Sequence, residues 1–169
     1  MFVLRKFKLS DVEKCLKIYN YYIKHSLGNF EEKPLTTMEF TILSKKILLE
    51  KLPFIICTKN SKLVGFTFLN KFRNKSGYRF SYENSIYVDN HFLGQGMGNK
   101  LLKELINVSS KIKEIKTIIA VIGSHNSEAS IKTHKKNGFN IIGKLKKVGF
   151  KKNQWLDSIY MQRILNEKN

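Results

Sequence analysis

Three glycines at alternate positions, Gly94, Gly96 and Gly98, lie between an apolar stretch and a stretch with helical periodicity. Glycine is unfavourable in regular structure unless the backbone needs a positive φ or must approach another group closely. A glycine loop that leads into a helix presents free N–H groups and the positive end of the helix dipole to an anion. The segment is therefore typical of a phosphate-binding loop.

Two common phosphate-binding motifs do not fit this loop. The G-x-G-x-x-G spacing of dinucleotide-binding loops fails because Asn99 or Leu101 stands at its last position. The P-loop pattern fails because Lys100 follows Asn99 rather than glycine, and no Ser or Thr comes next to hold Mg²⁺. No Asp-rich cluster or histidine spacing predicts a metal site. What fits is a loop that binds a pyrophosphate through main-chain amides, as proteins hold coenzyme A.

The composition predicts a cytoplasmic globular protein. The chain has 169 residues and a formal net charge of +18, and its two cysteines have no C-x-x-C spacing. Its longest apolar run, residues 117–122, is too short to span a bilayer, and its first residues predict no secretion signal. Since the positive charge is almost all lysine, we interpret it mainly as solvated surface, so nucleic acid is not the expected partner.

The hydrophobic patterns predict one α/β domain over residues 1–169, with the glycine loop at its centre. The expected strands cover residues 2–8, 53–59, 62–72, 78–88, 117–123, 139–149 and 154–165. The expected helices cover residues 12–25, 36–50, 98–110 and 128–137. Ser10 and Glu13 form a capping-box pattern before the first helix. The second helix is expected to turn Leu43, Ile47 and Leu48 inward.

Three further blocks accompany the glycine loop: YENSIYV, ASI..H...GF and VGFK...W.D....Q..L. In this order they resemble the GNAT superfamily of N-acetyltransferases and, within it, the phosphinothricin acetyltransferase family. The resemblance covers about residues 72–165. It implies a mixed central sheet of about seven strands flanked by about four helices. It further implies a homodimer that transfers acetyl from acetyl-CoA to the α-amine of an amino acid or analogue, such as phosphinothricin, methionine sulfoximine or methionine sulfone.

The resemblance also implies two catalytic residues. Glu83 is expected to be the general base that removes a proton from the amine; the alternative is a surface residue or a partner of a nearby lysine. His134 stands where many GNAT enzymes carry a tyrosine as general acid. It would line the substrate pocket or protonate the leaving thiolate, and the alternative is a histidine satisfied within its own helix.

A set of cofactor-binding residues follows from the same resemblance. The backbone of Tyr87 and Val88 would pair with the pantetheine arm, and one N–H would polarise the acetyl carbonyl. Asn126 and Ser130, near the start of the last helix, would reach the cofactor. The pyrophosphate would be held by the main-chain amides of Gln95, Gly96, Met97, Gly98, Asn99 and Lys100.

Acceptor recognition is assigned to four residues. Arg73 and Lys75, at the period of a strand, match basic substrate-site positions of the family and would bind acidic groups of the acceptor. The alternative for both is a solvated charged face. Phe30 would supply an apolar wall, and Ser85 follows Glu83 on the same side of its strand.

Two other functions remain open from the sequence. One is acetylation of a different small amine or of a protein N-terminus. The other is a non-catalytic, basic module that binds RNA or the ribosome on a GNAT scaffold; it would bind nucleic acid with a steep salt dependence and would not need Glu83.

Overall fold

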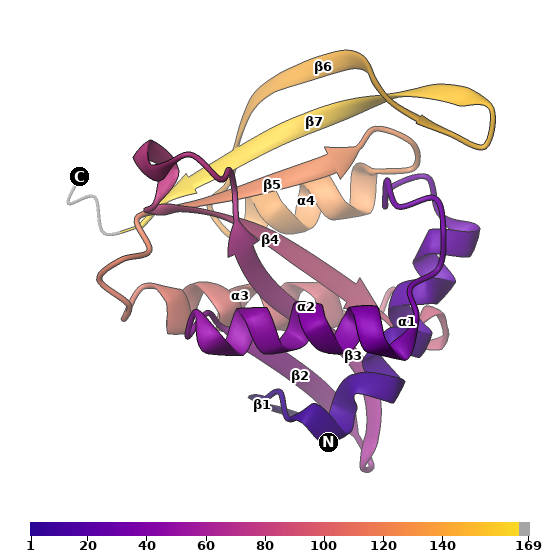
Figure 1. Cartoon of the computed structure of the whole chain (residues 1–169), viewed down its shortest axis with the longest axis vertical. Coiled ribbons are helices and arrows are strands. Elements are labelled where there is room, and N and C mark those ends of the chain that lie inside the picture. The colour runs from indigo at the N-terminus through magenta and orange to yellow at the C-terminus, as the bar shows by residue number, and fades with distance from the viewer. Residues whose placement is uncertain (166–169) are drawn as a thin grey trace.

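The computed structural model describes residues 1–165, which form a seven-stranded mixed sheet with helices on both faces (Figure 1). The sheet order is β1-β2-β3-β4-β5-β7-β6, and all neighbours are antiparallel except β4 and β5. The strands are β1 (Phe2–Lys6), β2 (Phe54–Lys59), β3 (Lys62–Lys71), β4 (Ser81–Val88), β5 (Thr117–Gly123), β6 (Asn140–Lys151) and β7 (Gln154–Ile164). The helices are α1 (Val12–His25), α2 (Thr37–Leu49), α3 (Met97–Ser109) and α4 (Glu128–Lys136). The predicted fold class is confirmed.

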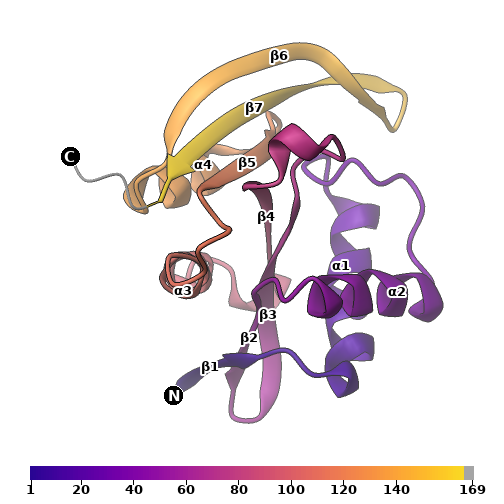
Figure 2. The same ribbon diagram turned by 60° about the vertical axis from the view of Figure 1, so that its left-hand side comes forward.

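The helices divide between the two faces of the sheet. Figure 2 shows α1 and α2 on one side of β3 and β4, and α3 on the other side. The helix α1 buries the face that its periodicity predicts, namely Val12, Leu16, Tyr19 and Ile23. The helix α3 packs against β2, β3 and β4, and α4 packs beside α3. Within residues 1–165, no helix is both long enough and apolar enough to cross a membrane.

The pairing of β4 with β5 positions the site. The two parallel strands are in register only at Ser81–Thr117, Tyr82–Ile118 and Glu83–Ile119. Beyond Glu83, β4 continues to pair with β3, and β5 continues to pair with β7. The two strands therefore diverge after Glu83, and peptide groups on their facing edges are left without sheet partners.

Three details of the sequence prediction are wrong. A 3-10 turn, Leu9–Asp11, precedes α1, so the first helix is not capped by Ser10 and Glu13; a capping box forms instead at Thr36 and Glu39, before α2. Leu48 is exposed, because the buried face of α2 is formed by Phe40, Ser44 and Ile47.

The third error concerns the connection between β3 and β4. The strand β3 ends at Lys71, and β4 begins only at Ser81. The intervening segment contains a 3-10 turn, Ser76–Tyr78. Arg73 and Lys75 consequently lie in a loop and do not share a strand face.

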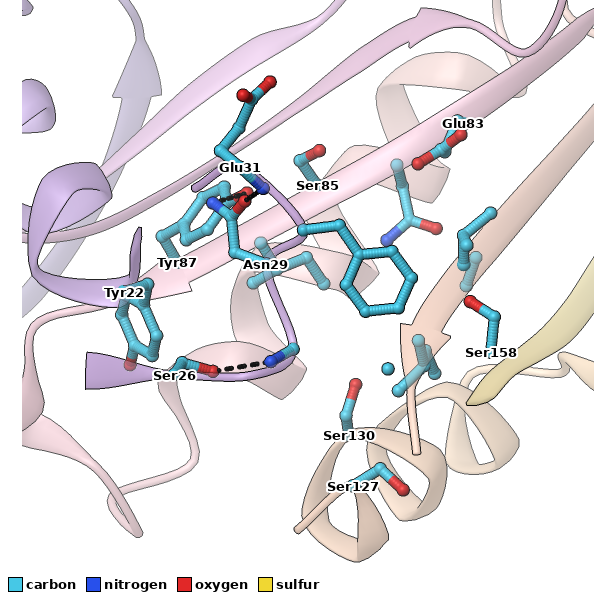
Figure 3. Close-up of a pocket in the computed structure, with 18 of the residues that line it drawn as sticks. Tyr22, Ser26, Asn29, Glu31, Glu83, Ser85, Tyr87, Ser127, Ser130 and Ser158 are labelled. Carbon is cyan, nitrogen blue, oxygen red and sulfur yellow. Dashed lines mark hydrogen bonds between the residues drawn. The ribbon is translucent and has the colours of Figure 1, made fainter. Parts of the chain in front are cut away.

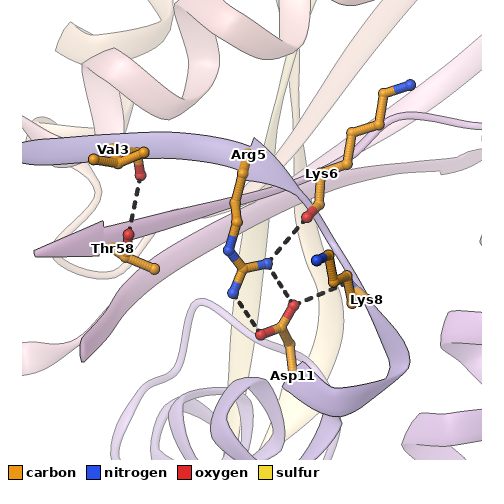
Figure 4. A network of polar contacts seen from close by, with 6 residues as sticks. All are labelled: Val3, Arg5, Lys6, Lys8, Asp11 and Thr58. Carbon is orange, nitrogen blue, oxygen red and sulfur yellow. Dashed lines mark hydrogen bonds and ion pairs between the residues drawn. The ribbon is translucent and has the colours of Figure 1, made fainter. Parts of the chain in front are cut away.

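An ion pair joins the first strand to the turn before α1 (Figure 4). Both guanidinium amino groups of Arg5 donate to the carboxylate of Asp11 at 2.7 Å. Asp11 also accepts the backbone N–H of Lys8 at 2.9 Å. These bonds lower the pKa of Asp11, with the Arg5 side chain as the largest cause. The contact fixes the entry of α1, whose other end leads to the loop over the site.

Candidate active site

A cavity of about 580 Å³ occupies the opening between β4 and β5. Its walls come from both strands, from α1, from the start of α4 and from Ser158 of β7, and the loop after α1 crosses it (Figure 3). The residues that line it and that the sequence predicts for the site are Phe30, Glu83, Ser85, Tyr87, Asn126, Ser130 and His134. Residues from α1, β4, β5, α4 and β7 therefore meet at the point where the sheet divides.

Glu83 lies at the point where β4 and β5 separate, since it forms the last matched pair of the two strands. Burial raises the pKa of its carboxyl above the ordinary value of 4.5, and the positive charge of Arg73 partly opposes this. A carboxylate whose pKa is raised is a stronger base than one in water. Glu83 can therefore take a proton from a group held in the cavity.

The face of the sheet that carries Glu83 is polar beside it and aromatic further along β4. Asn70 of β3 stands directly opposite Glu83. Tyr87 contacts the rings of Tyr19 and Phe66, at centroid distances of 4.9 and 5.2 Å. Asn29 in the loop after α1 donates to the Tyr87 hydroxyl at 3.4 Å. An amine beside Glu83 would thus lie between polar groups, with apolar surface available for its side chain.

His134 belongs to α4 and lies at one end of the cavity. Both of its ring nitrogens have hydrogen-bond partners in the protein. Nδ1 lies 2.8 Å from the carbonyl oxygen of Ser130, which can only accept a hydrogen bond, so Nδ1 carries the proton. Nε2 then accepts from the side-chain amide of Asn84 at 3.1 Å. Burial lowers the pKa of His134 below 6.5, which favours the neutral ring. This geometry favours a histidine that holds the cavity wall rather than one that delivers a proton.

The sequence interpretation missed two buried polar residues of the cavity wall, Asn84 and Ser158. Their exposed fractions are 8% and 1%. Within the described residues, Oδ1 of Asn84 and Oγ of Ser158 have no hydrogen-bond partner. Because buried polar atoms without partners are costly, these two mark places where a bound molecule can supply a bond. Nothing in the local sequence of either residue signals this, because it depends on which strands meet.

Tyr22 of α1 was also missed. Its hydroxyl donates to the carbonyl oxygen of Val88 at 2.6 Å, and burial raises the pKa of Tyr22 to about 12. The Val88 carbonyl oxygen already accepts this hydrogen bond within the protein. The backbone N–H of Val88 is therefore the better candidate for pairing with a ligand. The bond also ties α1 to the end of β4, immediately before the glycine loop.

The glycine loop ends in the first turn of α3. Gly94 and Gly96 have φ values of +74° and +76°, which other residues adopt only with strain. Gly96 is the N-cap of α3, so the N–H groups of Met97, Gly98 and Asn99 belong to the open first turn. Lys100 is a correction to the prediction, because its N–H donates to the carbonyl of Gly96 at 3.1 Å. The buried side chain of Met97 anchors the turn.

Gly98 needs another explanation. Its backbone is helical, and a Cβ atom added there would meet nothing within 4 Å. Neither conformation nor packing within the protein therefore requires glycine at this position. A ligand that approaches the backbone closely is the explanation that remains.

The matching family is the acetyltransferase (GNAT) domain, whose sequence profile fits residues 4–160. The chain belongs to the GNAT acetyltransferase family. It is 34% identical over 156 residues to a phosphinothricin N-acetyltransferase of Alcaligenes faecalis, a match that covers 92% of this chain and 79% of the relative. It is 28% identical over 158 residues to an L-methionine sulfoximine/L-methionine sulfone acetyltransferase of Salmonella typhimurium, covering 94% and 91%.

A solved GNAT structure resembles the chain along nearly its whole length. It is a phosphinothricin acetyltransferase from Sinorhizobium meliloti in complex with acetyl-CoA. The TM-score is 0.94 at 31% identity, and the match covers 99% of this chain and 90% of that one.

The predicted acceptor residues of this GNAT chain fall into two groups. Phe30 and Ser85 line the cavity, whereas Arg73 and Lys75 do not. Arg73 is nonetheless near enough to Glu83 to influence its pKa, and its guanidinium lies 5.0 Å from the ring centroid of Phe72. Lys75 is exposed in the loop. Within residues 1–165, no group of three or more metal-ligating side chains is present.

Proposed function

We propose that this GNAT protein acetylates the α-amine of an amino acid or a close analogue, with acetyl-CoA as the donor. The observation that carries the proposal is the position of Glu83. It is a half-buried carboxylate with a raised pKa at the branch point of β4 and β5, in a cavity large enough for a small molecule. The names of the relatives support an amino-acid-like acceptor.

The donor would be held by backbone groups. The open first turn of α3, with Met97, Gly98 and Asn99, fits a pyrophosphate, because its N–H groups and the helix dipole both favour an anion. The unpaired edges of β4 and β5 fit the amide-bearing pantetheine arm between them. Asn126 and Ser130 line the same opening and would border this arm.

Glu83 would act on the acceptor. An α-amine is mostly protonated at neutral pH, and a positioned base contributes about 10²–10⁴-fold to such reactions. Glu83 would take the proton directly or through one water, and the neutral nitrogen would attack the thioester carbonyl. The N–C bond forms, the C–S bond breaks, and the second proton that the nitrogen loses neutralises the leaving thiolate. An N–H on the free edge of β4 beyond Glu83 would stabilise the charge that develops on the carbonyl oxygen.

The acceptor carboxylate would be met by Arg73. Its positive charge already acts on the carboxylate of Glu83. The lysine at position 75 would add positive charge near the entrance to the cavity. Both assignments rest on charge and on the family resemblance.

The test is thiol release from acetyl-CoA with phosphinothricin, methionine sulfoximine, methionine sulfone, methionine, a polyamine and a short peptide as separate acceptors. We expect turnover with the amino-acid analogues and its loss in Glu83→Gln. Turnover restricted to the peptide or the polyamine would redirect the acceptor class. Salt-sensitive RNA binding without turnover would favour the non-catalytic alternative, against which the position of Glu83 in the cavity argues.

We further propose that the protein is a cytoplasmic homodimer. Its edge strand β6 is exposed along most of its length and, with the start of β7, carries exposed apolar side chains: Ile141, Ile142, Leu145, Val148, Phe150 and Trp155. Such a surface is typical of a protein interface. The two cysteines are buried free thiols, as a reducing compartment permits. Light scattering of the purified protein, with Ile142→Asp for comparison, tests the dimer.

A further inference from the structure

The loop between α1 and α2 forms one wall of the cavity. Ser26, Gly28, Asn29, Phe30 and Glu31 all line it. In Figure 3, Asn29 and Glu31 lie over the part of β4 that carries Ser85 and Tyr87. The position of this loop therefore sets how much room a molecule beside Glu83 has.

A buried lysine holds the loop from the opposite end of the chain. Lys151 is the last residue of β6, and only 2% of it is exposed. Its ammonium group donates to the carbonyl oxygens of Ser26 and Asn29, at 3.0 and 2.6 Å. Among residues 1–165, no carboxylate forms a salt bridge with Lys151.

Burying an unpaired ammonium group is costly, and burial together with Lys152 lowers the pKa of Lys151. The carbonyl oxygens of Ser26 and Asn29 are the hydrogen-bond partners of its ammonium group. A charged donor bound to two carbonyls of one short loop fixes that loop more firmly than a neutral hydrogen bond would.

The ring of Phe30 packs against β6 and β5 at positions that are occupied by glycine. A Cβ atom at Gly149 of β6 would lie 2.9 Å from Cε2 of Phe30, and one at Gly123 of β5 would lie 3.2 Å from Cε1. The same atom at Gly123 would lie 2.9 Å from the Cα of Gly28. Any larger residue at either position would push the loop away from the strands. About a third of Phe30 stays exposed, so the ring also meets the cavity.

We infer that Lys151 is a positioning residue. Together with Gly123 and Gly149, against which the Phe30 ring packs, it sets the depth of the acceptor pocket. The inference rests on the proposed function, since it assigns the acceptor to this cavity. The acceptor class that fits is an α-amino acid with a compact side chain that ends against the Phe30 ring. Lengthening that side chain, or moving the ring toward Glu83, reduces the room available.

The first test compares Lys151→Met with Lys146→Met, which removes an exposed lysine from the same strand. Methionine keeps the length of the side chain but cannot bind the two carbonyls. We expect Lys151→Met to raise the acceptor KM about tenfold or more, because small misplacements of positioning groups are costly. The KM for acetyl-CoA should stay within about twofold. Lys146→Met should change neither constant. An unchanged acceptor KM in Lys151→Met would overturn the inference.

Gly149→Ala supplies a second variant if Lys151→Met does not fold. The variant would be assayed with two amino-acid acceptors whose side chains differ in length. The added methyl group should displace Phe30 and lower kcat/KM for the acceptor with the longer side chain about tenfold relative to the other. Equal effects on both acceptors would contradict a pocket whose depth depends on Phe30.

A third measurement does not depend on turnover. Backbone amide exchange at residues 27–31 should be faster in Lys151→Met than in wild type or Lys146→Met, while exchange in α3 stays the same. If no acceptor is turned over by any variant, the proposed function fails, but the loop measurement still decides the role of Lys151. Unchanged loop exchange would refute that role.

Discussion

The side-chain amide of Asn84 lies 3.1 Å from Nε2 of His134, on the side of the ring opposite the Ser130 carbonyl. The Ser130 carbonyl fixes the tautomer, and the two contacts together leave neither ring nitrogen free. A histidine held in this way needs a rearrangement before it can give a proton to a leaving thiolate. Asn84 itself keeps an unbonded Oδ1 in the cavity wall. The pair therefore forms a rigid polar end to the pocket.

His134→Gln should consequently reduce kcat much less than Glu83→Gln does. Glutamine can keep one of the two hydrogen bonds, whereas Glu83→Gln removes the proposed base. We expect a loss of less than about tenfold for His134→Gln against at least about 10²-fold for Glu83→Gln. Steady-state kinetics with one acceptor decide the comparison, and equal losses would restore His134 as a proton donor.

His134 should also make stability depend on pH. Its pKa in the folded protein lies below the ordinary 6.5, so the unfolded chain binds more protons as the pH falls. The contribution of the neutral ring is complete above pH 6.5 and decreases below it. Urea unfolding at several pH values should show a smaller loss of stability below that pH in His134→Gln than in wild type.

Arg73 should determine the pH at which kcat/KM falls on the acidic side of the pH profile. As the proposed base, Glu83 would have to be ionised for activity, and its pKa is raised by burial and lowered by Arg73. Arg73→Gln removes the lowering effect, so the limb of kcat/KM should move to higher pH. Arg79→Gln is the matched control, because the Arg79 guanidinium lies over the ring of Phe80 at 4.5 Å and has no recorded effect on Glu83. If the acidic limb does not move in Arg73→Gln, Arg73 does not influence the pKa of the group that must be ionised for activity.

Gly98→Ala should separate folding from donor binding. Alanine is favoured over glycine inside a helix by about 0.5–1 kcal/mol, and space around position 98 is open, so the variant should fold at least as stably as wild type. The methyl group would nevertheless stand where a phosphate must approach the backbone. We expect a higher Kd for acetyl-CoA by calorimetry. Gly77→Ala, also in open space, should leave this Kd unchanged.

The ion pair of Arg5 with Asp11 should stabilise the fold at neutral pH. Asp11→Asn should lower the free energy of unfolding by about 1–2 kcal/mol, less than for a fully buried pair because Arg5 is partly exposed. The pKa of Asp11 is lowered from 3.8, so this contribution is present above that pH and disappears as the pH falls through the folded-state value. The two proteins should converge in strong acid. Glu50→Gln, which breaks the exposed pair with Lys71, should change little.

The sequence patterns predicted every strand and α-helix of the described chain. For most of these elements the cause is burial of an apolar face; β6 is an exception, because most of its residues are exposed. The errors lie where other forces decide. Ser10 and Glu13 match a capping box, but the turn before α1 is organised by the carboxylate of Asp11. Arg73 and Lys75 match the period of a strand, but Asn74 and Ser76 follow them instead of apolar residues, and β3 ends before them.

The candidate site was predictable to the extent that it depends on local signals. The glycine loop and Glu83 stand out in the sequence, whereas nothing in the sequence predicted the burial of Asn84, Ser158 and Lys151, although Asn84 and Lys151 belong to the blocks that carry the family resemblance. Their burial results from contacts between segments far apart in the chain, such as the β5–β7 register that places Ser158 opposite Gly123. Only the three-dimensional arrangement reveals that Asn84 and Ser158 line the cavity and that Lys151 binds the loop that forms its wall.

Lys151 and Ser26 are separated by 125 positions in the chain. The wall of the cavity can therefore be completed only after the β6–β7 hairpin has been synthesised and has paired with β5. A nascent chain that ends before this hairpin would carry the glycine loop and Glu83 without the acceptor pocket. Because contacts between distant residues form late and slowly, the ability to discriminate among acceptors should be the last property that this protein acquires as it folds.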